Sequence, residues 1–265
     1  FESEKLFMQN IQKGKISMET KVKKGYGKGW ALILYAFLAY FTATAVGSAM
    51  NAASGTLSEL RGWNAALLTS FISLGSIANV VAGFIFGKLS TKASAKKLSV
   101  FCSIVWIAVV LGMGVTTNLW AFAFCLIIAN GISNALGYQL APVMIAKWFP
   151  KRKGIIMGIV TMGIPLCSGV ATMMYQAGYA AMGSLGGFLP FIAVLVVALI
   201  VLLLFLADDP SEKGFTPDNG VSVDVEEEKE INKESIWTTK KLLSTPQVWI
   251  HGIMLGVQLL FASGL

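Results

Sequence analysis

Long apolar stretches alternate with short polar ones along most of this chain. Between residues 30 and 207, six apolar stretches follow one another, and each is close to the length of about 20 residues that a helix needs to cross a bilayer. This pattern predicts an all-α membrane protein with a six-helix bundle. The predicted spans are Trp30–Met50, Ala66–Gly87, Leu98–Val115, Leu119–Ala146, Gly154–Gln176 and Gly187–Ala207.

Polar segments flank this six-span unit of residues 30–207. Residues 1–29 are rich in lysine and predict an N-terminal tail, and residues 208–245 are first acidic and then weakly amphipathic, which predicts a linker with a short surface helix. Residues 246–265 begin with a proline and are apolar, as expected for the start of a seventh span. We therefore expect the sequence to be the N-terminal part of a longer transmembrane protein.

Basic residues lie almost entirely on one side of the predicted topology. Of the 21 lysines and arginines, 20 fall in the tail, in residues 88–97, in residues 147–153 or after residue 207, whereas Arg61 lies on the other side. Short loops rich in lysine and arginine stay in the cytoplasm. The distribution predicts a multi-pass protein of the plasma membrane with a cytoplasmic N-terminus, and it explains the net charge of +7 without a nucleic-acid partner.

Composition excludes most enzymatic chemistry. Charged residues make up 13% of the chain and apolar ones 55%, whereas soluble domains carry about 25% charged residues, so lipid is the expected solvent. The spans contain no nucleophile–base pair and no metal-ligand spacing, and Cys102, Cys125 and Cys167 are expected to be packing residues. We therefore expect no enzyme activity, no cofactor and no metal.

Uncharged polar residues recur at helical spacing in the first, second, fourth and fifth spans, whereas the third and sixth are plainer. A buried polar group without a partner costs roughly 2–7 kcal/mol, so these four spans are predicted to line a wet cavity or to pack together, with the other two facing lipid. The alternative, that these groups only join helices, stays open. The candidate cavity residues are Tyr40, Thr44, Asn51, Asn79, Asn130, Asn134, Tyr138 and Gln176.

Small residues spaced four apart predict close helix contacts at Gly83 with Gly87 and at Gly154 with Gly158. Prolines at positions 142 and 165 interrupt the backbone ladder within spans, as in the moving or binding helices of transporters and also in ordinary membrane helices.

Two loops resemble motifs of a known family. The segment GKLSTKASAKK, residues 87–97, resembles the G-x-L-x-D-R-x-G-R-K motif of the major facilitator superfamily, although Thr91 replaces the motif's aspartate and Ser94 its glycine. The segment from Trp148 to Gly158 is similar to the W-F-P-x-R-x-G-x-x-x-G run of the oxalate/formate antiporters and their monocarboxylate-transporter relatives. The matching loop residues are Gly87, Leu89, Lys92, Lys96, Lys97, Trp148, Phe149, Pro150, Arg152, Gly154 and Gly158.

This resemblance implies a fold and a function. Members of the superfamily have two six-span halves joined by a cytoplasmic loop, with spans one, two, four and five lining the cavity. The implied function is secondary active transport of a small organic anion, a mono- or dicarboxylate, by antiport or symport. The implied partners are the anion, the lipid bilayer and a C-terminal half of the same chain, where the antiporter branch carries its cationic substrate residues. The alternative is a membrane sensor or scaffold of the same fold that does not transport.

Overall fold

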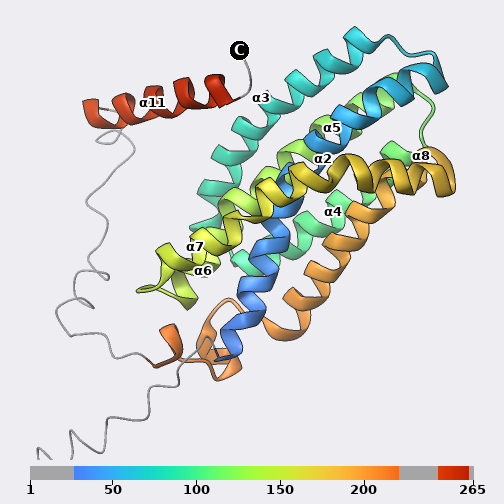
Figure 1. Ribbon diagram of the computed structural model, residues 1–265. Helices are drawn as coiled ribbons and strands as arrows, with labels where there is room; N and C mark the ends of the chain where they lie inside the picture. Colours follow the sequence, from blue (N-terminus) through green and yellow to red (C-terminus); the bar gives the residue numbers. More distant parts are fainter. Residues whose placement is uncertain (1–26, 221–243, 263–265) are drawn as a thin grey trace, which may run out of the picture. The chain divides into compact units, whose positions relative to one another are not determined.

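The computed structural model describes residues 27–220 and 244–262 (Figure 1). The chain divides into two units, Phe1–Val221 and Ser222–Leu265, and each is described by itself. In the second unit, the helix α11 (Pro246–Ala262) begins at the proline where the sequence predicts a helix to begin. Most of the predicted tail and the predicted surface helix of the linker lie outside the described residues.

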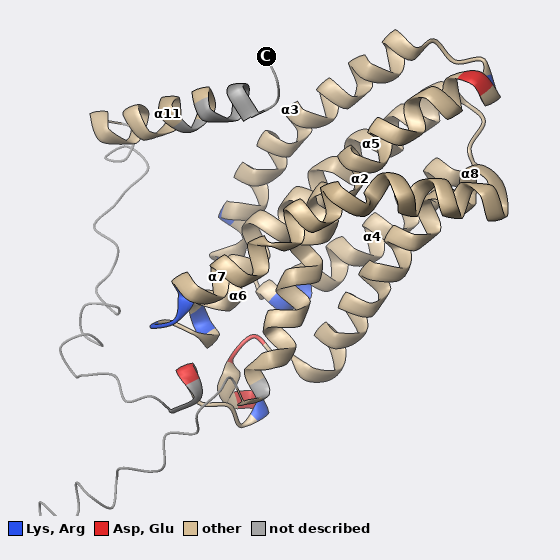
Figure 2. Ribbon diagram, in the orientation of Figure 1, with Lys and Arg blue, Asp and Glu red and all other residues tan. Residues whose placement is uncertain are grey.

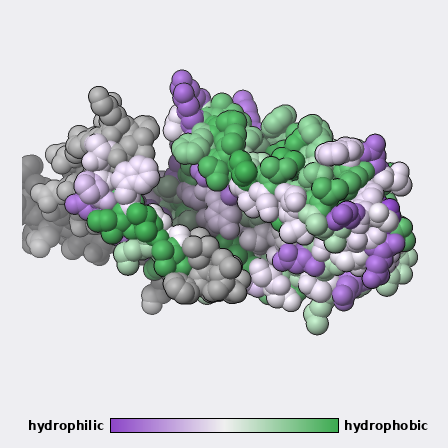
Figure 3. Space-filling view, turned by 90° about the horizontal axis from the view of Figure 1, so that it is seen from above, coloured by the Kyte–Doolittle hydropathy of each residue, from purple (hydrophilic) through white to green (hydrophobic). Residues whose placement is uncertain are grey.

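The first unit is a bundle of long helices, and the described residues contain no strand. Its surface carries large apolar areas, drawn in green in Figure 3, as expected for a bundle that lipid surrounds. Five of its helical segments are long and apolar enough to cross a membrane. The elements are η1 (Gly27–Gly29), α2 (Trp30–Arg61), α3 (Ala65–Ser90), α4 (Ala95–Val115), α5 (Leu119–Asn134), η2 (Ala135–Leu140), α6 (Ala141–Trp148), α7 (Lys153–Thr161), α8 (Gly163–Phe205), η3 (Pro210–Lys213) and η4 (Pro217–Gly220).

The longest element, α8, contains two of the six predicted spans. It is interrupted at Met182 and at Gly183, whose φ of 67° and ψ of −151° are open to glycine and strained for other residues. At this point the chain reverses direction, as the sharp bend of α8 in Figure 1 shows. The fifth span therefore consists of α7 and the first arm of α8, and the sixth span is the second arm.

Glycines let the two arms of α8 meet closely beside the bend. A Cβ atom built on Gly186 would overlap the carbonyl oxygen of Gly178, and one built on Gly178 would overlap the carbonyl oxygen of Gly186. A Cβ on Gly187 would lie 2.5 Å from the ring of Tyr175. By contrast, Gly154 and Gly158 have open space beside them, so the prediction that this pair permits a close helix contact is wrong.

The first helix continues well past the predicted end at Met50. It ends at Arg61 and is followed by Gly62 in the left-handed conformation, a common helix terminator. The guanidinium group of Arg61 donates hydrogen bonds to the carbonyl oxygen of Gly114 at 3.1 Å and to the hydroxyl of Ser184 at 2.6 Å. The one basic residue predicted on this side therefore joins the end of α2 to the end of α4 and to the second arm of α8.

The second span, α3, is less buried than the third, α4, although the polar residues of the second span predict that it packs against other helices or lines a cavity. In their most apolar stretches, 56% of the residues of α2 are buried but only 22% of those of α3, against 39% for α4. The hydroxyls of Ser70, Ser73 and Ser76 on α3 donate to the carbonyl oxygens four residues earlier in the same helix. Because these hydroxyls are satisfied within α3, they require neither a wet cavity nor a partner helix.

We expect Gly186→Ala to destabilise the bundle, because the added methyl group collides with backbone that cannot rotate away. Overpacking of this kind typically costs about 1–3 kcal/mol, so the midpoint of thermal unfolding in detergent should fall. The matched control is Gly158→Ala, a helical position with open space beside it, where the midpoint should stay or rise slightly. Equal midpoints for the two variants would contradict the tight contact.

Candidate functional site

A polar pocket of about 370 Å³ lies between α3 and the junction of α5 with η2. Its polar side chains are three amides, Asn79 from α3, Asn134 from the end of α5 and Gln139 from η2. The remaining lining residues are Val80, Gly83 and Phe84 of α3. None of the six lining residues carries a charge, so the pocket offers amide N–H donors and carbonyl acceptors to a ligand.

Two glycines of α3 make room for these amides. A Cβ atom on Gly83 would lie 3.4 Å from Nε2 of Gln139 and 3.8 Å from Oδ1 of Asn134, and one on Gly87 would lie 3.5 Å from Oε1 of Gln139. The predicted close approach at this glycine pair is therefore an approach of amide side chains to the helix backbone. The oxygen Oδ1 of Asn79 is buried and has no hydrogen-bond partner within the described chain, an exception to the usual pairing of buried polar groups.

A π-helical turn, η2, positions Gln139. Pro142 has no N–H to donate to the carbonyl four residues earlier, and the chain responds with a wider turn in which the N–H of Ala141 bonds to the carbonyl of Leu136. Helical spacing of four places Tyr138 on the face of Asn134, but the wider turn gives that place to Gln139. Sequence reasoning therefore missed Gln139, although Pro142 was a signal for the irregular turn.

Tyr138 instead packs against the first helix. Its ring meets that of Tyr40 edge to face, with centroids 5.5 Å apart and planes at 87°. Tyr40 is 3% exposed and Tyr138 is 38% exposed, so Tyr138 reaches the bundle surface while Tyr40 lies beneath it. Tyr40 and Tyr138 therefore contact each other but do not line the polar pocket, whereas Asn134, one turn earlier in sequence than Tyr138, does.

The other four candidate cavity residues do not line the pocket. The side-chain amide of Asn130 donates to the carbonyl oxygen of Leu126 at 2.9 Å, and the amide packs against Gly75, so it serves the α3–α5 contact. Thr44 donates to the carbonyl oxygen of Phe41 within its own helix. Asn51 and Gln176 are exposed on α2 and α8.

The two motif loops lie at one end of the bundle, called here the basic end (Figure 2). Lys88, Lys92 and Lys97 are exposed there, and Gly154 is exposed in the first turn of α7. Pro150 and Arg152 lie half-buried in the turn between α6 and α7. The motif residues thus surround the ends of spans two to five, and among them Gly87 packs against Gln139 at the edge of the polar pocket.

The loop after α6 is held by Asp218. This carboxylate is 1% exposed and accepts hydrogen bonds from the backbone N–H groups of Lys151 at 2.8 Å and Arg152 at 3.2 Å. These N–H groups lie just before α7, which begins at Lys153, and a carboxylate beside a helix N-terminus interacts favourably with the positive end of the helix dipole. Asp218 comes from the predicted linker, so the beginning of that segment belongs to the bundle.

A second aspartate of the same segment holds the start of α4. Asp208 accepts from the hydroxyl of Ser94 and from the backbone N–H of Lys96 at 2.9 Å. The ammonium group of Lys96 in turn donates to the carbonyl oxygen of Leu206 at 2.6 Å. Ser94, which departs from the family motif, also caps α4, because its hydroxyl oxygen accepts from the backbone N–H of Lys97 at 3.1 Å.

An aromatic cluster fills the space between these contacts. The indole of Trp148 stacks on Phe215 with centroids 5.2 Å apart and donates to the carbonyl oxygen of Ala207 at 3.3 Å. Phe149 meets Phe215 edge to face and lies directly against Gly29, where a Cβ atom would overlap its ring. Residues 208–220, the strap, are therefore anchored by two carboxylates and one buried aromatic ring.

Comparison with known proteins gives one family. The family model described as Major Facilitator Superfamily matches residues 32–265, which is most of the chain. A comparison with curated proteins finds no match.

We expect Asp218→Asn to loosen the strap without straining the backbone, because asparagine tolerates the φ of 53° at this position. Asparagine keeps one acceptor oxygen, carries no charge and places an NH2 group where the second acceptor was. Loss of one hydrogen bond to a charged acceptor, worth about 1.5–3 kcal/mol, should speed hydrogen exchange at the amides of Lys151 and Arg152 by roughly tenfold or more.

The matched control is Asp209→Asn in the same strap. The carboxylate of Asp209 is exposed, and hydrogen bonds from the hydroxyl and N–H of Ser211 hold its pKa below the ordinary value. Because Asp209 contacts neither amide, exchange at Lys151 and Arg152 should not change. Equal exchange in both variants would show that Asp218 does not hold the loop.

Proposed function

Because the chain belongs to the Major Facilitator Superfamily, a family of membrane transporters, we propose that it is a secondary active transporter of a small organic anion, a mono- or dicarboxylate. The observation that carries this proposal is the amide pocket between α3 and the α5–η2 junction, which places three uncharged polar side chains within a membrane-spanning bundle. In such surroundings a group of hydrogen-bonding side chains without ligand is costly, so a polar solute is the natural occupant.

The position of the pocket suits alternating access. Val80 and Phe84, which flank the amides, are 60% and 78% exposed, so the pocket opens on the surface of this bundle. In transporters built from two repeats, the substrate site lies at the repeat interface, and the repeats rock around it. A site on the outside of one six-span bundle is where a second bundle would complete it.

The chemistry of the pocket supports recognition of a carboxylate in part. The amides of Asn79, Asn134 and Gln139 can donate to carboxylate oxygens and orient them. They cannot neutralise the charge, and a desolvated carboxylate without a countercharge is strongly disfavoured. We propose that a cationic residue from a C-terminal half of the same protein supplies this charge, as the resemblance of the Trp148–Gly158 loop to oxalate/formate antiporters implies.

The basic end is proposed to face the cytoplasm, with the protein in the plasma membrane. This orientation follows from the lysines and arginines gathered at that end, because such loops are retained on the cytoplasmic side. The strap then lies on the cytoplasmic surface, where it leads from the six-span half into the linker. On the opposite side, Arg61 is tied to Gly114 and Ser184 within the bundle.

Uptake and counterflow in proteoliposomes containing the full-length protein test the proposal. Labelled formate, oxalate, lactate and pyruvate are offered with and without a pH gradient. Exchange that requires a carboxylate on the opposite side and ignores the gradient identifies an antiporter, whereas gradient-driven uptake identifies proton symport. Binding of a carboxylate without flux would favour a sensor of the same fold. If no carboxylate is bound and none is transported, this substrate class is excluded.

We expect Asn79→Leu and Asn134→Leu each to weaken the apparent affinity for the transported anion by roughly tenfold, because each removes a hydrogen bond worth about 1–1.5 kcal/mol. The measurement is the concentration dependence of counterflow. The control is Ser70→Ala on the opposite face of α3, whose hydroxyl is satisfied by the carbonyl of Ala66 and should not affect transport. Unchanged kinetics in both asparagine variants would exclude the pocket as the substrate site.

A further inference from the structure

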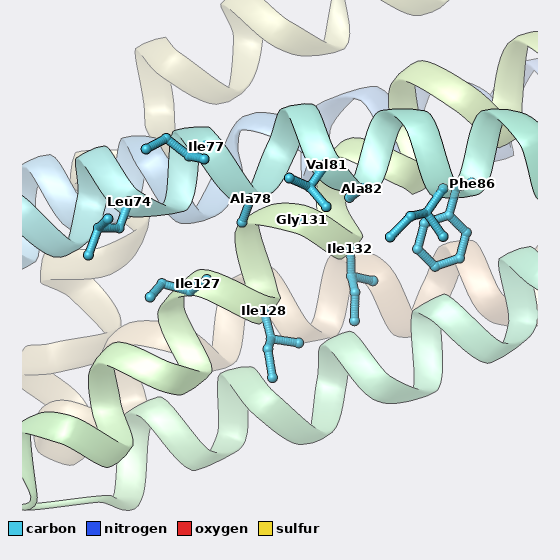
Figure 4. Close-up of a pocket in the computed structure, with 11 residues that line it drawn as sticks. Leu74, Ile77, Ala78, Val81, Ala82, Phe86, Ile127, Ile128, Gly131 and Ile132 are labelled. Carbon is cyan, nitrogen blue, oxygen red and sulfur yellow. The ribbon is translucent and has the colours of Figure 1, made fainter.

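The contact between α3 and α5 has a groove on each side, and the two differ in chemistry. One side holds the polar pocket, and the other holds an apolar groove of about 470 Å³ (Figure 4). The apolar groove is lined by residues of α3 between Leu74 and Phe86 and by residues of α5 between Ile127 and Ile132. All of its lining residues are aliphatic, aromatic or glycine, so a water molecule would find no side-chain partner there.

Small residues form the floor of this groove and larger ones its walls. A Cβ atom on Gly131 would lie 3.4 Å from both the carbonyl oxygen of Ala78 and the methyl group of Ala82, which shows how closely the two helices meet. Ile77 and Val81 stand along one wall and are 62% and 51% exposed (Figure 4). The result is an apolar channel along the bundle surface, matched in polarity to a hydrocarbon chain.

The groove has the length of one bilayer leaflet. Leu74 and Phe86 are twelve residues apart, which corresponds to roughly 18 Å along a helix, whereas half of a hydrocarbon core is about 15 Å. At its Phe86 end, the groove leads toward the basic end of the bundle. A chain lying in it would therefore place its polar terminus at the membrane surface on that side.

A basic residue stands where that terminus would be. Lys88 lies on the same face of α3 as Ile77, Val81 and Ile85, because these positions are spaced four, four and three residues apart. It is exposed in the last turn of the helix. A lysine at this depth extends its ammonium group to the interface, where it attracts anionic lipid head groups.

We propose that the α3–α5 groove is a binding site for an anionic phospholipid of the leaflet at the basic end. One acyl chain lies in the groove between Ile77 and Ile128, and the phosphate group is held by Lys88. The proposal depends on the membrane placement of the bundle and not on the identity of the transported solute.

Electron paramagnetic resonance with spin-labelled lipids tests this site directly. The full-length protein is reconstituted in phosphatidylcholine vesicles with a trace of labelled phosphatidylglycerol or labelled phosphatidylcholine, and the immobilised fraction is measured. We expect the anionic lipid to be preferred. Lys88→Gln should reduce that preference by roughly fivefold, because one lysine near the membrane surface strengthens the binding of anionic lipid by about this factor.

The control for the charge is Lys153→Gln at the exposed start of α7, which should leave the preference unchanged. The groove itself is tested by Val81→Trp, which fills it, against Ile104→Trp on the exposed face of α4. Val81→Trp should lower the immobilised fraction of both lipids, and Ile104→Trp should not.

Several outcomes would overturn the proposal. Equal effects of Lys88→Gln and Lys153→Gln would show that the head group is attracted by the overall charge of the basic end. Equal immobilisation in Val81→Trp and Ile104→Trp would show that lipid does not enter the groove. Crosslinking of cysteines placed at position 81 between copies, or to another span of the same protein, would show that a helix occupies it instead.

Discussion

A bilayer offers no water to a polar group, and this constraint governs the whole structure. Every backbone N–H and C=O within the membrane must be paired inside the chain, which makes long helices the available solution. The serines of α3 follow the same rule through bonds to their own carbonyls. At the ends of the bundle, helices leave backbone groups unpaired, and charged side chains bond to them. At the basic end, Asp208 and Asp218 accept hydrogen bonds from N–H groups at helix starts. At the other end, Arg61 donates to the carbonyl oxygen of Gly114.

Where the chain could be predicted from sequence, the same constraint explains why. The number of spans follows from the length of the apolar stretches, and the family match supports the superfamily that the loops resemble. The glycine bend at Gly183 separates two spans that the pattern already counted as two. Helix ends were less predictable, because α2 continues to Arg61 through residues that are only weakly apolar. Apolar residues indicate which part of a helix lies in lipid, whereas the helix itself ends where its backbone groups find other hydrogen-bond partners.

The candidate site was predicted only in part. Periodicity brought Asn79 and Asn134 into consideration, and the structure places both in one pocket. It could not supply Gln139, because a spacing of four assumes a regular helix and Pro142 imposes a wider turn. Polarity alone also overstated the role of hydroxyls and amides, since the serines of α3 and Asn130 of α5 donate to carbonyl oxygens of their own helices. The strap was missed because Asp208 and Asp218 resemble linker residues in composition, and the contact of Phe215 with Trp148 is visible only in three dimensions.

The π-turn at Ala135–Leu140 has a consequence for how the chain tolerates change in length. Such a turn contains one residue more than the α-helical turn that it replaces. Deleting a single residue here would restore a regular α-helix and leave the orientation of α6 relative to α5 nearly unchanged, because the turn already absorbs one extra residue. The indole of Trp148, at the end of α6, would then keep its place against Phe215. The same deletion in a regular part of α5 would rotate all of the following helix by about 100° and turn the indole away from the strap.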